Sequence, residues 1–536
     1  MSRDPHGYIS FKSLAALSGA LVMGGLFTVS LFGDNIRSLF GASADSLAGN
    51  EYRYPMAGVA LEGHKSLADF SAASADSPYG GEVASGDKHE DHGVNGFFST
   101  EQDRFSTFAI DVDTASYTFS RRAIREGRLP HAAGVRVEEF VNAFAYGYPA
   151  PRQAPFSVSV DGMPSPFDPD RVFLRVGLQG RRVEAKDRKP ARLVFLVDVS
   201  GSMSSPDKLP MAQEALKLLA RNLRPKDTVA LCTYAGSTRL VLPPTGAEDL
   251  ETIEEAIDSL TSGGGTAMNS GLETAYALAR KGLSPQVTTR VIVLSDGDAN
   301  LGPSRTGDML QTIAQGAREG VTLTTVGFGS GNYNDAAMER LADEGNGQSV
   351  YIDGPKEARK VFQAQLEGTL EVIAKDVKIQ VEFDSSVVKR YRLVGYENRD
   401  IADRDFRNDA RDAGEVGAGH SVTAVYELEL TDRAADLGTV RVRAKDPEAG
   451  VEDPATEYAF AIGATAVGPA AEASDDLRFA LGVASLAERL RGSAFALEWS
   501  AETIVELTCD AAGQSDERVE HCELARQAAH LLESRS

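Results

Sequence analysis

Between residues 193 and 370 the sequence alternates regularly between short apolar runs and amphipathic segments. The runs Leu193–Val197 and Val291–Leu294 are continuous and apolar, as expected of strands that are buried on both faces of a sheet. The segments Leu209–Leu223 and Met268–Leu283 have the spacing of amphipathic helices. This alternation predicts an α/β fold in which helices cover both faces of a doubly wound, mainly parallel sheet.

Different patterns surround this region, and 536 residues are too many for one hydrophobic core. Alternating strands between polar turns follow the α/β region and are typical of an antiparallel sandwich, and the end of the chain has helical spacing. The predicted parts are an N-terminal signal anchor (1–40), a flexible linker (41–96), a small α+β module (97–187), the α/β domain (188–372), a β-rich module (373–470) and a helical C-terminal region (471–536).

The formal net charge of −23 restricts the partners of the chain. Such a surface repels nucleic acid and anionic membrane faces, so neither is expected as a ligand. Cysteine gives little information about the compartment. Cys232 lies in an apolar run and is interpreted as a buried thiol, whereas Cys509 and Cys522 are close enough in sequence to pair, and their bonding stays open.

An apolar segment without charged residues, Leu14–Gly33, is long enough to span a bilayer as a helix. Arg3 and Lys12 precede it, which favours a cytoplasmic N-terminus. These features predict an uncleaved signal anchor that crosses the cytoplasmic (inner) membrane once. The bulk of the chain would then be extracytoplasmic (periplasmic), and this helix would be its one contact with the membrane. The alternatives are secretion after cleavage near Ala42-Ser43-Ala44 and, least favoured, a buried helix of a soluble protein.

Polar residues that suit a metal ion follow three predicted strands or loops. Asp198, Ser200 and Ser202 form a D-x-S-x-S pattern directly after the first strand, Thr266 follows three glycines, and Asp296 follows a later strand. Ligands of such sheets bind at the carboxyl ends of the strands, and carboxylate and hydroxyl oxygens suit hard cations. The sequence therefore predicts a site for Mg²⁺, with Mn²⁺ or Ca²⁺ as alternatives. The alternative without a metal is that Asp198 or Ser200 caps the next helix.

With these five residues, the segment Leu193–Leu370 resembles the von Willebrand factor A domain, and the residues match the metal-ion-dependent adhesion site of that family. The resemblance implies that Ser200, Ser202 and Thr266 are direct or near-direct ligands. It further implies that the two aspartates bind the metal directly or through water. A partner protein would then offer an acidic side chain to the metal.

Further segments resemble the bacterial YfbK-like family, namely Thr107–Tyr117, Gly327–Asp335 and Gly395–Arg399. The resemblance covers about Phe97–Arg491 and implies an envelope-associated protein with an N-terminal flanking module, the A domain and a C-terminal region of uncharacterised function. Members often look like lipoproteins. This chain lacks the cysteine that a lipoprotein carries after its apolar segment, which implies a different attachment.

The predicted function is metal-dependent protein–protein interaction or adhesion, without catalysis. The pattern after Asp198 places serines where a second catalytic carboxylate would be needed, and Gly263–Thr266 lacks the lysine of a phosphate loop. The alternatives are a scaffold or regulatory subunit of an envelope complex or of an ATPase partner and, less favoured, a Mg²⁺-dependent hydrolase. The oligomeric state is left open.

Three further patterns carry smaller predictions. Asp111-Val112-Asp113-Thr114 offers either a second metal site or a capped turn between a strand and a helix, of which the turn is favoured. His89-Glu90-Asp91-His92 is expected to be a solvated charge run in the linker. The segment Met203–Lys208 is expected to border the metal face, and so are Asn332 and Tyr333.

Overall fold

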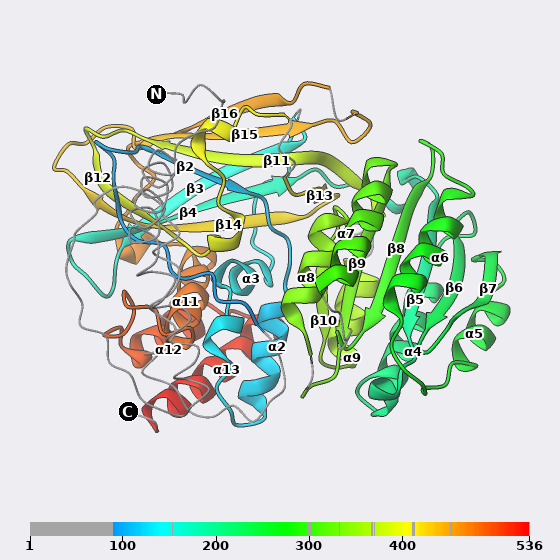
Figure 1. Cartoon of the computed structure of the whole chain (residues 1–536). Coiled ribbons are helices and arrows are strands. Elements are labelled where there is room, and N and C mark those ends of the chain that lie inside the picture. The colour runs from blue at the N-terminus through cyan, green and yellow to red at the C-terminus, as the bar shows by residue number, and fades with distance from the viewer. Residues whose placement is uncertain are drawn as a thin grey trace, which may run out of the picture. The chain divides into compact units, whose positions relative to one another are not determined.

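The computed structural model (Figure 1) describes residues 89–534, apart from 153, 298–302, 332, 366–367, 369, 410–412 and 451–452. The predicted anchor helix Leu14–Gly33, most of the predicted linker and Asn332 lie outside these residues.

A six-stranded sheet forms the centre of the α/β domain, in the order β10-β9-β8-β5-β6-β7. Neighbouring strands are parallel except for the edge pair β6 and β7, which is antiparallel. The predicted doubly wound, mainly parallel sheet is therefore confirmed. The strands are β5 (Ala191–Asp198), β6 (Thr228–Tyr234), β7 (Thr238–Gly246), β8 (Thr288–Ser295), β9 (Val321–Phe328) and β10 (Ser349–Ile352).

Helices cover both faces of this sheet, and the alternation of side chains along β5 explains why. Leu193 and Phe195 belong to one apolar cluster with Leu216 of α4, whereas Leu196 belongs to another with Leu272 of α6. Successive residues of a strand point to opposite faces, so an apolar run fills two cores at once. The helices are α4 (Leu209–Arg221), α5 (Leu250–Asp258), α6 (Met268–Arg280), α7 (Pro303–Arg318), α8 (Asp335–Glu344) and α9 (Pro355–Arg359).

Two antiparallel sheets combine strands from both sides of the α/β domain in the sequence. One has the order β1-β12-β14-β4-β3, and the other has the order β13-β11-β15-β16, with β2 paired to β11. Phe108 of β2 and Tyr426 of β14 belong to one apolar cluster, so the two sheets share a core. Their strands are β1 (Phe98–Ser99), β2 (Phe105–Ala109), β3 (Phe156–Pro164), β4 (Arg171–Gly180), β11 (Val372–Phe383), β12 (Val388–Val394), β13 (Val416–Gly417), β14 (Ser421–Leu430), β15 (Gly438–Lys445) and β16 (Thr456–Ile462).

A group of helices packs on the outer face of the first antiparallel sheet (Figure 1). Tyr117, Phe140, Phe479 and Leu524, each from a different helix, belong to one apolar cluster with Phe173 of β4. The predicted domain boundaries stay predictions, but the segments before and after the α/β domain form these sheets and this cluster together. The helices are α2 (Ala115–Arg125), α3 (Val137–Asn142), α11 (Asp475–Leu490), α12 (Ala501–Asp510) and α13 (Asp516–Glu533).

The predicted single-pass location in the inner membrane is contradicted. In the part of the chain that the structure describes, no helix is both long enough and apolar enough to cross a bilayer. The longest described helix, α13, has 18 residues, and its first turn already carries Asp516, Glu517 and Arg518. Charged side chains at this density are too costly to place in hydrocarbon.

Candidate functional site

Asp198 is the last residue of β5 and is fully buried. One of its carboxylate oxygens accepts a hydrogen bond from the backbone N–H of Ser200 at 2.8 Å, and the other accepts one from the hydroxyl of Ser295 at 2.9 Å. Burial raises the pKa of Asp198 and the nearby Asp296 carboxylate adds to this, although the hydrogen bonds from Ser200 and Ser295 oppose it.

The hydroxyls of Ser200 and Ser202 lie 2.9 Å apart, directly beyond Asp198. Ser200 is buried and Ser202 is half-buried, so this pair lies between the interior and the surface. The D-x-S-x-S pattern thus places a carboxylate and two hydroxyls in one short loop, as its spacing predicted. Sequence analysis did not identify Ser295, whose hydroxyl lies between two carboxylate-bearing loops.

The glycine-rich loop before Thr266 lies against this first loop. Gly201 N–H donates to the carbonyl of Gly264 at 3.2 Å, and Gly263 N–H donates to the carbonyl of Val199 at 2.7 Å. Gly264 has a φ of +89°, a conformation that favours glycine, which explains the glycine at this point of the loop. Thr266 itself is half-buried and is tied to the first loop through this backbone.

Asp296 follows β8 and is fully buried. Its neighbour Ser295 accepts a hydrogen bond from Gly297 N–H at 3.0 Å while donating to Asp198, which connects the ends of β5 and β8. The structure therefore brings the predicted residues to one edge of the sheet. Ser200 contacts both Asp198 and Ser202, Asp296 is adjacent through Ser295, and Thr266 is joined through its loop.

Lys208 is a component of this site that sequence analysis did not assign. Its ammonium donates to a carboxylate oxygen of Asp296 at 2.9 Å, and the Lys208 and Asp296 side chains are 8% and 0% exposed. A cation therefore already stands beside one of the two carboxylates. The segment Met203–Lys208 borders the site as predicted, but through this buried ion pair.

Tyr333 was expected at the metal face, and this prediction is wrong. The residue is fully buried and belongs to an apolar cluster with Phe119 of α2 and Tyr351 of β10. An aromatic ring that follows a strand can pack inward onto a neighbouring helix as well as outward, and here α2 covers it. The prediction of a solvated charge run also fails at His89, because its side chain is 2% exposed and its Nδ1 lies 3.4 Å from a carboxylate oxygen of Asp335.

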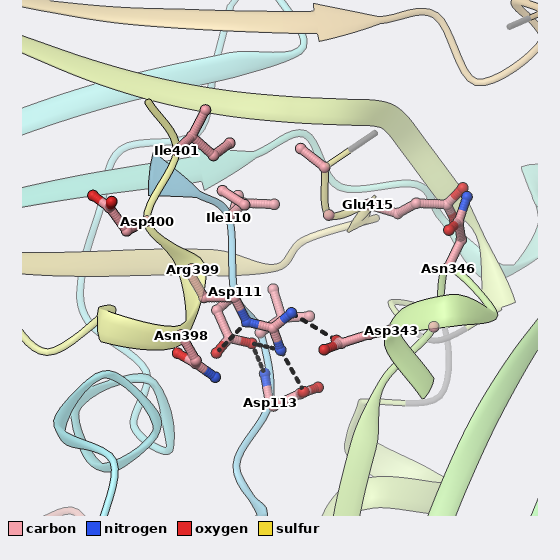
Figure 2. Close-up of a pocket in the computed structure, with 15 residues that line it drawn as sticks. Ile110, Asp111, Asp113, Asp343, Asn346, Asn398, Arg399, Asp400, Ile401 and Glu415 are labelled. Atoms are coloured by element: carbon pink, nitrogen blue, oxygen red, sulfur yellow. Dashed lines mark hydrogen bonds and ion pairs between the residues drawn. The ribbon is translucent and has the colours of Figure 1, made fainter. Parts of the chain in front are cut away.

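The carboxylates of Asp111 and Asp113 surround an arginine, as Figure 2 shows. Arg399 reaches Asp111 at 3.3 Å and Asp113 at 3.1 Å, and it also donates to Asp343 at 2.6 Å, beside a cavity of about 230 Å³. Among the described residues, no group of three or more His, Cys, Asp or Glu side chains is arranged to hold a metal ion. The favoured turn is present, held by Asp113 N–H donating to Asp111 at 3.0 Å. Its N-cap Thr114 makes no side-chain capping bond.

The donor set at the ends of β5 and β8 fits a divalent cation by its chemistry. It offers two buried carboxylates and neighbouring hydroxyls, all hard oxygen donors of the kind that Mg²⁺ accepts. The buried carboxylates also need a positive charge nearby to be stable in the ionised form. Lys208 supplies one such charge for Asp296.

Three family models match parts of the chain. The model described as "von Willebrand factor type A domain" matches residues 193–364, and one described as "von Willebrand factor" matches 83–175. The model described as "Uncharacterized protein YfbK, C-terminal" matches residues 368–437 and 429–531. Together these matches follow the order of parts along the chain.

Individual proteins are also similar to the chain, over different shares of its length. The chain is 36% identical over 441 residues to "Uncharacterized protein YfbK" of Escherichia coli (strain K12), which covers 77% of this chain and 76% of that protein. The solved structure of a von Willebrand factor type A protein from Catenulispora acidiphila is 20% identical, with a TM-score of 0.41, over 72% of this chain and 89% of that chain. The conserved hypothetical protein BatB from Bacteroides thetaiotaomicron is 20% identical, with a TM-score of 0.28, over 33% and 97%. By its identity to the Escherichia coli protein over most of both chains, this protein belongs to the YfbK family, and it contains a von Willebrand factor type A domain.

Proposed function

We propose that the A domain binds a divalent cation, preferentially Mg²⁺, and uses it to hold an acidic side chain of a protein partner. The ligands are the side chains of Asp198, Ser200, Ser202, Thr266 and Asp296. The observation that supports this proposal is the pair of fully buried carboxylates at the ends of β5 and β8, with a hydroxyl pair beside one of them. A buried carboxylate is costly unless a positive charge lies near it, so two such carboxylates at one sheet edge, beside the ammonium of Lys208, favour a site for a cation there.

The charge of the chain supports a role for the metal in recognition. With a formal net charge of −23, the protein repels an acidic partner at long range. A doubly charged ion held by two formally charged ligands keeps the ability to accept an additional carboxylate. An acidic partner is therefore expected to bind in the presence of the metal and to be released when the metal is removed.

We propose interaction rather than catalysis because the loop after Asp198 offers serines where a second catalytic carboxylate would be needed. A screen with phosphate ester and carboxylic ester substrates in Mg²⁺ tests this assignment. Turnover that Asp198→Ala abolishes would show an enzyme instead.

Calorimetric titration of the full chain with Mg²⁺, Mn²⁺ and Ca²⁺ tests the metal site. Asp198→Asn keeps the shape of the side chain but removes its charge, and binding is expected to weaken by about 100-fold or more because a charged ligand is lost. The matched control is Asp249→Asn, since Asp249 caps α5 through Thr252 N–H and asparagine caps equally well. Equal metal binding by the parent and Asp198→Asn would refute the site.

A further inference from the structure

Lys208 lies where a bound divalent cation would compete with it for the carboxylate of Asp296. Its ammonium is 2.9 Å from Asp296, and its methylene groups pass over Gly329, just after β9. A Cβ atom at Gly329 would come within 2.4 Å of Lys208 Cε, and Gly329 has a φ of +75°. The glycine therefore leaves room for the lysine to reach Asp296.

Helix α2 belongs to the segment that precedes the A domain (residues 97–187), which we call the flanking part. This helix contacts the turn that carries Lys208. Arg122 Nη2 donates to the carboxylate of Asp207 at 2.7 Å, and Lys208 N–H donates to the carbonyl of Ser205 at 3.0 Å. Although partial burial alone would raise it, hydrogen bonds from Ser205 and Arg122 hold the pKa of Asp207 below its usual range. The residue next to Lys208 is thus anchored, in its charged form, to α2.

Arg122 is also connected to Gly329, the residue that the side chain of Lys208 crosses. Arg122 Nη1 donates to the hydroxyl of Tyr351 at 3.0 Å, and that hydroxyl donates to the carbonyl of Gly329. Helix α2 therefore contacts both the residue that precedes Lys208 and, through Tyr351, the residue that Lys208 crosses. Phe119 of α2 packs against Tyr351 in the same region, with ring centroids 5.8 Å apart.

We propose that Lys208 is a built-in competitor of the metal for Asp296, and that the docking of α2 through Arg122 sets how strongly it competes. The inference rests on the proposed function, because it concerns regulation of the same site. An ammonium and a divalent cation beside one buried carboxylate repel each other strongly in a low-dielectric environment. Metal binding thus requires Lys208 to leave Asp296, which pulls on the turn that Arg122 holds.

The coupling is reciprocal by thermodynamic necessity. If the contact of α2 stabilises the state in which Lys208 is paired with Asp296, release of α2 strengthens metal binding. Bound metal in turn weakens the contact of α2 with the A domain. The affinity for an acidic partner would then depend on a contact between the A domain and the flanking part.

Titration of the full chain with Mg²⁺ and Mn²⁺ compares the parent with Lys208→Met and Arg122→Met. Lys208→Met is expected to bind metal about tenfold more tightly, and Arg122→Met about two- to fivefold more tightly, since only part of the restraint is lost. The matched controls are Lys217→Met, which removes a lysine of α4 paired with Glu214 and Asp258, and Arg128→Met, which removes an arginine paired with Glu126. Both controls are expected to leave the affinity unchanged.

Thermal unfolding separates competition from a purely structural role. Without metal, Lys208→Met is expected to lower Tm because Asp296 loses its counter-charge, whereas with excess Mg²⁺ its rise in Tm is expected to exceed that of the parent. If the parent binds metal and Lys208→Met binds it equally or more weakly, the competitor role is wrong while the metal site stands. If neither binds metal, the proposed function fails and this inference fails with it. If Lys208→Met does not fold, an unchanged affinity in Arg122→Met overturns the coupling.

Discussion

The guanidinium of Arg136 donates to a carboxylate oxygen of Asp335 at 2.7 Å, and both side chains are buried. Arg136 precedes α3 in the flanking part, and Asp335 is the first residue of α8 in the A domain. Arg136 also contacts Glu139 and lies 3.3 Å from Glu339. One buried cation therefore serves several carboxylates at the contact between these two parts.

Removing that cation is expected to destabilise the protein strongly. Arg136→Leu leaves the buried carboxylates of Glu139, Asp335 and Glu339 without it, and loss of one partner of a buried pair typically costs about 3–5 kcal/mol. Denaturant unfolding measures the change. The control is Arg407→Leu, because Arg407 is 62% exposed and its pair with Glu457 is expected to contribute about 1 kcal/mol at most. Equal losses in both variants would contradict the assignment.

Glu138 gives a pH dependence of stability. It is buried, and its carboxylate accepts a hydrogen bond from Tyr396 N–H at 2.9 Å. Burial, and then the nearby carboxylates of Glu397 and Asp111, raise the pKa of Glu138 to about 7. Because the folded value lies above the ordinary value of 4.5, the fold favours the protonated form, and this contribution is lost as the pH rises through about 7.

Glu138→Gln is therefore expected to raise Tm relative to the parent at pH 8 and to change it little at pH 4.5. The amide is neutral at both values and keeps an oxygen that can accept from Tyr396. Thermal unfolding at the two pH values measures this, with the exposed Glu255 of α5 changed to Gln as the control. A difference between parent and Glu138→Gln that is the same at both pH values would rule out the titration.

The central sheet and the D-x-S-x-S loop could be predicted from sequence because their signals are local. A continuous apolar run such as Leu193–Val197 indicates by itself a buried strand, and the end of that strand indicates where the following loop lies. The lysine at Asp296 could not be predicted, since Lys208 and Asp296 are 88 residues apart and no pattern in either segment specifies the other. The pairing of β2 with β11 could not be predicted for the same reason, because the A domain separates the two strands in the sequence.

The acidic pattern at Asp111 and Asp113 shows this limit most clearly. Its residues resemble metal ligands when read alone, but the structure places Arg399, 286 residues after Asp113, among them. A side chain from a distant turn supplies the positive charge. The local sequence shows which carboxylates are close together, whereas the positive charge that balances them depends on the tertiary fold.

His521 of α13 predicts a second pH dependence, of opposite sign. It is fully buried, its Nδ1 lies 3.3 Å from the hydroxyl of Tyr117, and its ring packs edge-on against Phe144. Burial lowers the pKa of His521 to about 3, from an ordinary value of 6.5. Between these values the unfolded chain binds a proton that the folded chain does not, so stability falls as the pH drops below about 6.5, by up to roughly 1.4 kcal/mol per unit.

His521→Phe removes this proton, so its stability is expected to decline less steeply between pH 6.5 and pH 4 than that of the parent. His530→Phe is the control, because His530 is exposed on the same helix and its substitution should leave the slope unchanged. Urea unfolding at a series of pH values gives both slopes. Parallel declines in the parent and His521→Phe would show that His521 is not the group responsible.

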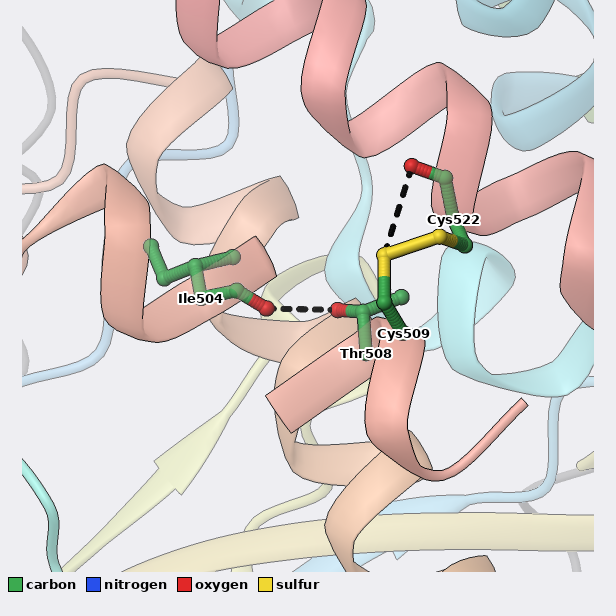
Figure 3. Close-up of a disulfide and its surroundings, with 4 residues drawn as sticks. All are labelled: Ile504, Thr508, Cys509 and Cys522. Carbon is green, nitrogen blue, oxygen red and sulfur yellow. Dashed lines mark hydrogen bonds between the residues drawn. A yellow bond between two sulfur atoms is a disulfide. The ribbon is translucent and has the colours of Figure 1, made fainter. Parts of the chain in front are cut away.

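The disulfide between Cys509 and Cys522 connects α12 to α13 and answers the pairing question that the sequence left open (Figure 3). The two cysteines are 13 positions apart in the sequence, and a bond that closes a loop of this size is expected to stabilise the fold by about 2–3 kcal/mol, mainly by restricting the unfolded chain. The double variant Cys509→Ser, Cys522→Ser is therefore expected to unfold at lower denaturant concentration. A reducing agent should lower the stability of the parent by the same amount and leave the double variant unchanged, because the remaining thiol, Cys232, is buried in the A domain. If the reducing agent leaves the parent unaffected, the bond contributes no measurable stability.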